Sequence, residues 1–151
     1  MECLWQLPGF GYESLTSILF KKRKVNPENI FLLGCRDLDS GEIKLINDLE
    51  INMWTIEDIK NKGAKATIEE LLEEIKKYPS DQVYCIGGDS VYKQLLPYCD
   101  IAHVTKIDFG YEADSYFPNL DEDPQWHVAA ESEEQTYFDL EYKFVRYERN
   151  K

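Results

Sequence analysis

Metal-binding and redox side chains are scarce in this sequence. Only two histidines occur, His103 and His127, and they lie in separate segments. Four cysteines stand far apart, at positions 3, 35, 85 and 99, and form no C-x-x-C pair. Because a zinc site needs closely spaced ligand pairs, we expect no metal centre. Separated, unpaired cysteines are typical of a reduced cytoplasmic protein.

Long apolar runs and an excess of positive charge are also missing. No stretch reaches the ~18 apolar residues of a membrane helix, and no basic segment followed by an apolar one opens the chain, so we expect neither a membrane partner nor a secretion signal. The chain has 17 Lys and Arg against 29 Asp and Glu, a net charge of −12. Since basic side chains must replace the counterions of phosphates, we expect no nucleic-acid partner.

The remaining composition is that of a folded protein. With 43% hydrophobic and 13% aromatic residues among 151, the chain has enough apolar side chains for the core of one domain. Residues 29–108 alternate between short apolar runs and helical patterns, after an irregular start with a short helix expected from Glu13 to Phe20. Strands are predicted at 30–35, 51–55, 83–86 and 101–107, and helices at 42–48 (with Ser40 as its N-cap), 67–78 and 89–96.

Strands that alternate with helices form βα units and a mainly parallel sheet. The last third differs, because 126–131 and 137–147 have the pattern of two strands joined by a polar stretch. They are predicted to form an antiparallel hairpin on the sheet edge. We therefore predict an α/β fold: one domain, residues 1–151, a three-layer Rossmann-like sandwich with a mainly parallel central sheet and a C-terminal antiparallel hairpin.

A glycine-rich segment, Ile86-Gly87-Gly88-Asp89-Ser90, lies where a predicted strand gives way to a helix. Two glycines let a ligand approach the backbone, and free N–H groups at a helix start suit a phosphate. A tight strand–helix turn without a ligand remains the structural alternative. Asp89 stabilises the helix dipole but competes with a phosphate.

Other polar residues have weaker patterns. Arg36-Asp37-Leu38-Asp39 follows a predicted strand, and its carboxylates are expected to cap a helix or form ion pairs rather than bind a cation. Thr105 is a polar group within an apolar strand, so it needs a hydrogen-bond partner, either in the protein or in a substrate. The remaining loop acids are expected to be solvated: Asp81, Asp100, Asp108 and residues 121–123.

Residues ~84–151 resemble the C-terminal half of dihydrofolate reductase. The matching segments are Val83 to Pro97, Val104 to Asp108, Glu112 to Pro118, Trp126 and Tyr147 to Arg149. The resemblance implies a Gly87-Gly88 turn, often with a cis peptide, that contacts NADPH together with Asp89, Ser90 and Val91. It also implies that Ile86 and Tyr92 border the nicotinamide and pterin, that Gln94 lies near the adenosine, and that Thr105 hydrogen-bonds into the pterin network.

Residues ~8–83 instead resemble an internal segment of the arginase family. The resemblance is carried by Pro8 to Phe10, Ile30 to Glu42 and Ile51 to Ile59. It implies that Asp39, with Asp37 and Glu42, matches residues near that family's substrate site. The manganese ligands of that family lie outside this segment or are replaced, as at residues 86–90.

The two resemblances meet within a predicted strand, whereas natural domain boundaries fall in exposed linkers. This predicts an engineered or recombined chimera without catalytic residues or a complete active site, which requires no cofactor and binds NADP(H) or phosphate weakly at most. The alternatives are a divergent dihydrofolate reductase and, with less support, an arginase-like hydrolase. Unpaired sheet edges allow a homo-oligomer.

Overall fold

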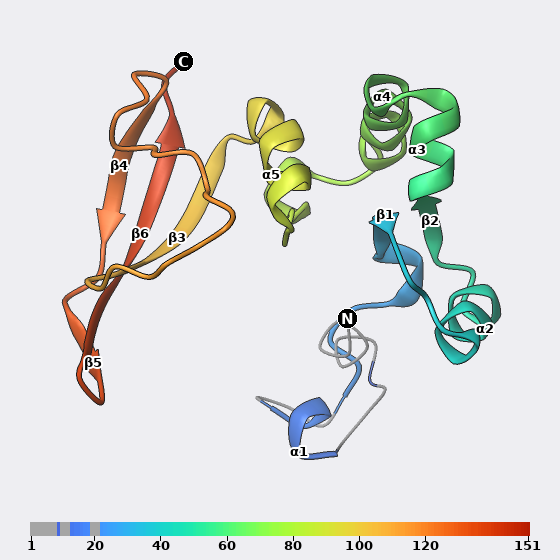
Figure 1. Ribbon diagram of the computed structural model, residues 1–151, viewed down its shortest axis with the longest axis horizontal. Coiled ribbons are helices and arrows are strands. Elements are labelled where there is room, and N and C mark those ends of the chain that lie inside the picture. Colours follow the sequence, from blue (N-terminus) through green and yellow to red (C-terminus); the bar gives the residue numbers. More distant parts are fainter. Residues whose placement is uncertain (1–8, 10–12, 19–21) are drawn as a thin grey trace. The chain divides into compact units, whose positions relative to one another are not determined.

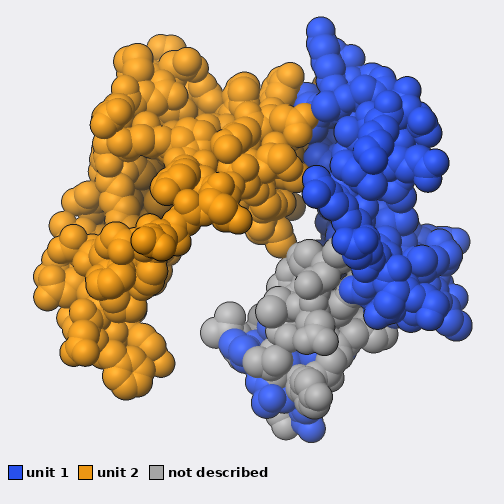
Figure 2. All heavy atoms as spheres, in the orientation of Figure 1, with its two compact units in different colours: residues 1–74 blue, residues 75–151 orange. Residues whose placement is uncertain are grey.

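The computed structural model describes residues 9, 13–18 and 22–151, which belong to two compact units, residues 1–74 and 75–151 (Figure 2). None of the helices in this described part of the chain is long and apolar enough to cross a membrane.

The first unit contains a parallel β-α-β arrangement. Its elements, in chain order (Figure 1), are α1 (Glu13–Thr16), η2 (Pro27–Asn29), β1 (Phe31–Cys35), α2 (Ser40–Asp48), β2 (Asn52–Thr55), α3 (Ile56–Lys62) and α4 (Ala64–Ile75). β1 pairs with β2 in parallel, with Leu32 opposite Met53. This confirms both predicted strands and the helix between them. α3 was not predicted, and α1 ends earlier than expected; Leu19 and Phe20 lie outside the described residues.

The core of this unit follows the predicted apolar spacing. Leu32, Ile46 and Ile51 form one buried cluster, in which Ile46 is 2% exposed. On α4, Ile68 and Leu71 are buried, which confirms the amphipathic pattern of the predicted helix 67–78. Burial of these side chains is the main stabilising contribution to such a unit.

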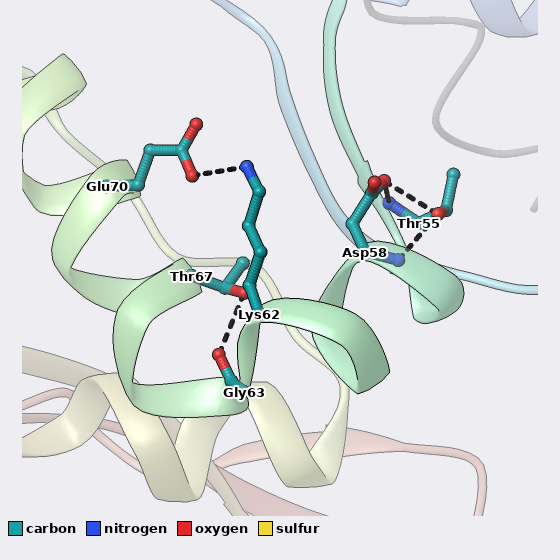
Figure 3. A network of polar contacts seen from close by, with 6 residues as sticks. All are labelled: Thr55, Asp58, Lys62, Gly63, Thr67 and Glu70. Atoms are coloured by element: carbon teal, nitrogen blue, oxygen red, sulfur yellow. Dashed lines mark hydrogen bonds and ion pairs between the residues drawn. The ribbon is translucent and has the colours of Figure 1, made fainter.

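Polar contacts hold the starts of α3 and α4 (Figure 3). Thr55 and Asp58 form a capping box, in which the Asp58 N–H donates to Thr55 Oγ1 at 3.1 Å and the Thr55 N–H donates to Asp58 Oδ2 at 2.8 Å. The Thr55 hydroxyl also donates to Asp58 Oδ2 at 2.7 Å, and this hydrogen bond, followed by that from the Thr55 N–H, lowers the pKa of Asp58. Lys62 Nζ lies 2.8 Å from Glu70 Oε2, which lowers the pKa of Glu70 and joins the two helices.

Asp39, not Ser40, is the N-cap of α2. Its Oδ1 accepts from the Glu42 N–H at 2.8 Å, and Glu42 Oε2 accepts from the Asp39 N–H at 3.1 Å. The prediction of Ser40 was therefore wrong by one residue, because the longer carboxylate completes a reciprocal capping box with Glu42. The expected capping role for the Arg36–Asp39 segment is confirmed at Asp39.

The second unit contains an antiparallel sheet. Its elements are η3 (Ser80–Gln82), α5 (Asp89–Leu95), η4 (Leu96–Tyr98), β3 (Ile101–Ile107), β4 (Trp126–Glu131), β5 (Gln135–Tyr137) and β6 (Leu140–Arg149). The strand order is β3-β6-β4, and β5 also pairs with β6 (Figure 1). The predicted C-terminal hairpin is confirmed as antiparallel β4–β6 pairing. Its second strand starts later than predicted, because the chain turns at Phe138, where φ is 53°.

Residues 83–86 form no strand, which corrects the third predicted one. Tyr84 and Ile86 are 72% and 63% exposed. A strand needs a neighbour for its backbone hydrogen bonds, and among the described residues no strand pairs with this segment. The fold is mixed α/β, with parallel pairing between two strands. A three-layer sandwich with a mainly parallel sheet is not confirmed.

The two faces of the antiparallel sheet differ in burial. On one, here called the covered face, Val145 and Tyr147 pack with Leu120 and Trp126, and with the partly buried Val104. The opposite face, here called the open face, contains Ile101, His103, Thr105, Ile107 and Phe144, all of them exposed.

Candidate functional site

The glycine turn predicted to contact a ligand is well defined in the structure. The Gly87–Gly88 peptide is cis, and Gly87 has φ 117°. Gly88 is the N-cap residue of α5, with no side-chain cap hydrogen bond. A Cβ built on Gly88 would meet nothing within 4 Å, whereas one on Gly87 would lie 3.3 Å from Tyr92 Oη. One side of the turn is thus open and the other is closed by Tyr92.

Tyr92 links the turn to the loop that follows β3. Its ring packs edge-on against Phe117, with centroids 5.4 Å apart. Burial, and secondarily Cys85, raises the pKa of the Tyr92 hydroxyl. The structure therefore brings together two segments that are 25 residues apart in the chain and that were both part of the dihydrofolate reductase resemblance.

The charge of Asp89 is paired within α5. Lys93 Nζ lies 2.8 Å from Asp89 Oδ1 and donates to Oδ2 at 3.0 Å. Hydrogen bonds from Lys93 and then Ser115 lower the pKa of Asp89. The competition between Asp89 and an anionic ligand, expected from the sequence, is therefore weakened by a cation one helical turn away.

The remaining predicted residues of this segment lie on the same turn and helix. Ile86, Gly88 and Ser90 are exposed, and Val91 is half-buried. Gln94 Nε2 donates to the Ser90 carbonyl at 3.0 Å, so its amide is held against its own helix. The segment 86–92 thus presents a glycine backbone and small side chains beside Tyr92.

Thr105 lies elsewhere in the same unit, on the open face. It is exposed and stands opposite Phe144 of β6; its hydrogen bond to a substrate stays a prediction. The residues that line a hollow of about 430 Å³ include Thr105, His103, Phe144, Arg146, Glu131 and Ser132. Residues 86–92 are not among the lining residues of this hollow.

One network was missed from the sequence. Asp121 was expected to be solvated, but it forms an ion pair with Lys106 and accepts a hydrogen bond from the Tyr147 hydroxyl at 2.7 Å. Lys106 and then Tyr147 lower the pKa of Asp121. Tyr147 is 1% exposed, and burial raises its pKa. Asp121 lies 15 and 26 residues from its partners, so no local pattern identifies it.

Arg149 anchors the segment before β3 to the C-terminal strand. Its Nε donates to the Cys99 carbonyl at 2.9 Å, its Nη2 to the Leu96 carbonyl at 2.6 Å and its Nη1 to Gln125 Oε1 at 2.7 Å. The guanidinium also stacks 4.5 Å above the Trp126 ring. This arrangement fixes η4, and through it the end of α5.

Within the described part of the chain, no three His, Cys, Asp or Glu side chains are grouped so that they could hold a metal ion.

The family model for dihydrofolate reductase matches residues 13–149. The chain belongs to the dihydrofolate reductase family. The resemblance noted in the sequence begins at about residue 84, whereas the family model already matches from residue 13.

Solved structures and curated proteins show similarity of two kinds. A dihydrofolate reductase from Enterococcus faecalis, complexed with NADP(H) and RAB-propyl, has a similar fold, with a TM-score of 0.54 and 23% identity over 80% of this chain and 61% of that chain. An arginase from Staphylococcus aureus is 43% identical over 78 residues, 52% of this chain and 25% of its own. A Bacillus subtilis arginase is 37% identical over 65 residues, 43% of this chain and 22% of its own.

The chain is therefore similar to dihydrofolate reductases over most of its length and to arginases over about half of it. It spans about a quarter of the length of the arginases.

Proposed function

We propose that this chain binds NADP(H), or another phosphate-bearing ligand, weakly at residues 86–92 and does not reduce dihydrofolate. In this proposal it is a recombined, engineered chimera forming a single domain, in which residues 1–83 derive from an arginase-like fragment and residues 84–151 from a dihydrofolate reductase-like fragment. The three-layer sandwich predicted from the sequence would require residues 83–86 to form a strand that pairs within the central sheet.

The observation that carries the binding proposal is the open backbone at Gly88. A side chain built there would meet nothing within 4 Å, so a ligand has access to the peptide groups that begin α5. Backbone N–H groups next to glycine are suited to phosphate oxygens. Ser90 adds an exposed hydroxyl, and the Asp89–Lys93 pair reduces local repulsion of an anion.

The residues present fit the phosphate-bearing part of the cofactor. Gly87, Gly88 and Ser90 would hold it, while Tyr92, braced by Phe117, would border the ring that carries the hydride. When bound, NADPH supplies hydride chemistry. The chain's own residues contribute contact and orientation, and the family's set of proton donor and nicotinamide loop has no match in residues 1–80.

The alternative, a divergent dihydrofolate reductase, needs a general acid within hydrogen-bond reach of the atom that it protonates. Glu131 lines the same hollow as Thr105, but its partner in the β4–β6 register is Val145, whereas Thr105 stands opposite Phe144. Because adjacent residues of a strand point to opposite faces, this register places Glu131 and Thr105 on different faces of the sheet.

Titration with NADPH, followed by the change in nicotinamide fluorescence, tests the binding proposal. Gly88→Leu fills the open side of the turn, and we expect at least a tenfold loss of affinity. Gly110→Leu is the matched control, because Gly110 also has open space around it and no positive φ, and it should bind as the unmodified chain does. Equal affinity of all three proteins would refute the proposed site.

A further inference from the structure

β3 has one unpaired edge. It is the end strand of the order β3-β6-β4, and in the described part of the chain no strand pairs with its other side. Its seven residues contain no acid, although the chain carries a net charge of −12. Ile101 and Ile107, at its two ends, are 41% and 45% exposed. Such an edge is a template for pairing with another strand.

The opposite edge of the sheet is less suited to pairing. The register of β4 with β6 shifts between Val128 and Ala130, and β4 ends in the acidic Glu131. Bulges and charged residues are the usual devices that protect an edge strand from a neighbour. β3 pairs with β6 without a break from Ile101 to Ile107, so it has no bulge.

A second copy of β3 is complementary to the first when the two run antiparallel. In a register centred on His103, Asp100 of each chain lies opposite Lys106 of the other. Asp100 extends the strand by one residue, because its carbonyl accepts from the Arg149 N–H at 2.9 Å. The Lys106 side chain is 40% exposed although it pairs with Asp121. Opposite charges directly across a strand pair stabilise it.

The neighbouring register that keeps the same faces together is less favourable. Centred on Val104, it would place Asp100 opposite Asp108 of the other chain, and like charges directly opposite destabilise a sheet. Registers shifted by one residue would place the covered face of one sheet beside the open face of the other. Charge and face therefore select the register centred on His103.

We propose that two copies of this chain pair antiparallel through their β3 edges, about a two-fold axis at His103, with Asp100 of each chain facing Lys106 of the other. The two sheets then form one continuous sheet whose open faces adjoin.

Sedimentation velocity over a range of concentrations tests the association in the full chain. We expect a species of twice the chain mass that Asp100→Lys shifts to monomer, because lysine then faces Lys106. Asp108→Lys is the matched control and should leave the dimer unchanged, since Asp108 has no partner in this register. A chain that stays monomeric at all concentrations, or a dimer strengthened by Asp108→Lys, would overturn the proposal.

Oxidative cross-linking tests the register independently. His103→Cys places two thiols directly opposite each other, within the Cα separation that a disulfide spans. Residue 105 is exposed on the same face, but in this register the Thr105→Cys thiols of the two chains would lie four residues apart along the strand, roughly 13 Å. We expect a cross-linked dimer for His103→Cys above the background of the native cysteines, and none for Thr105→Cys. The reverse pattern would contradict the register.

Discussion

Replacing Arg149 with methionine should destabilise the second unit measurably. The substitution keeps a side chain of similar length but removes the three guanidinium hydrogen bonds, to Cys99, Leu96 and Gln125. Hydrogen bonds from charged donors contribute about 1.5–3 kcal/mol each in favourable settings. The bond to Gln125 is exposed, and the Leu96 carbonyl keeps a second donor, the Cys99 N–H at 3.1 Å. Stacking on Trp126 adds about 0.5–1 kcal/mol.

Discounting for exposure, we expect a loss of roughly 2–4 kcal/mol for Arg149→Met. Gln125→Ala removes only the exposed bond and should cost about 0.5–1 kcal/mol. Urea unfolding, followed by fluorescence in a background where Trp5 and Trp54 are phenylalanine, reports on Trp126 directly. A cost of Arg149→Met no larger than that of Gln125→Ala would refute the reasoning.

Two further predictions concern electrostatics in each unit. Asp39→Ala removes the capping box of α2 and should cost about 0.5–2 kcal/mol, measured by urea unfolding; Asp37→Asn, which lies outside the box and keeps a residue type that tolerates the φ of 50° there, should cost less. In the folded chain the pKa of Asp121 is lowered, so its ionised carboxylate stabilises the fold. This stabilisation should be fully present above the ordinary aspartate pKa of ~3.9 and should be lost as the pH falls through the lowered value. Asp121→Asn should therefore reduce stability at neutral pH and flatten its dependence on acid pH; an unchanged acid limb would contradict this.

Local patterns predicted most elements, because helices and strands with one apolar face reveal their period. The helices around Ile46 and Ile68, and the strands at 31–35 and 101–107, are predicted in this way and are confirmed. The apolar run at 83–86 has the same pattern but forms no strand in the described structure, because pairing depends on a neighbour that sequence period cannot identify.

The candidate site was predicted unevenly for the same reason. The glycines at 87 and 88 are contiguous, so their turn could be located from the sequence, and the resemblance to dihydrofolate reductase anticipated the cis peptide. The contacts of Tyr92 with Phe117, and of Asp121 with Tyr147, join distant segments. Thr105 was predicted as a polar residue of an apolar strand, and the structure places it on the exposed face of the sheet. Which face is buried depends on tertiary packing.

The most direct test of the account is a measurement of dihydrofolate-dependent NADPH consumption by the purified chain. The account predicts that NADPH binds in a manner sensitive to Gly88→Leu while consumption stays at the rate of a protein-free control. Steady consumption that is abolished by Gly88→Leu would contradict it and establish the chain as a working reductase.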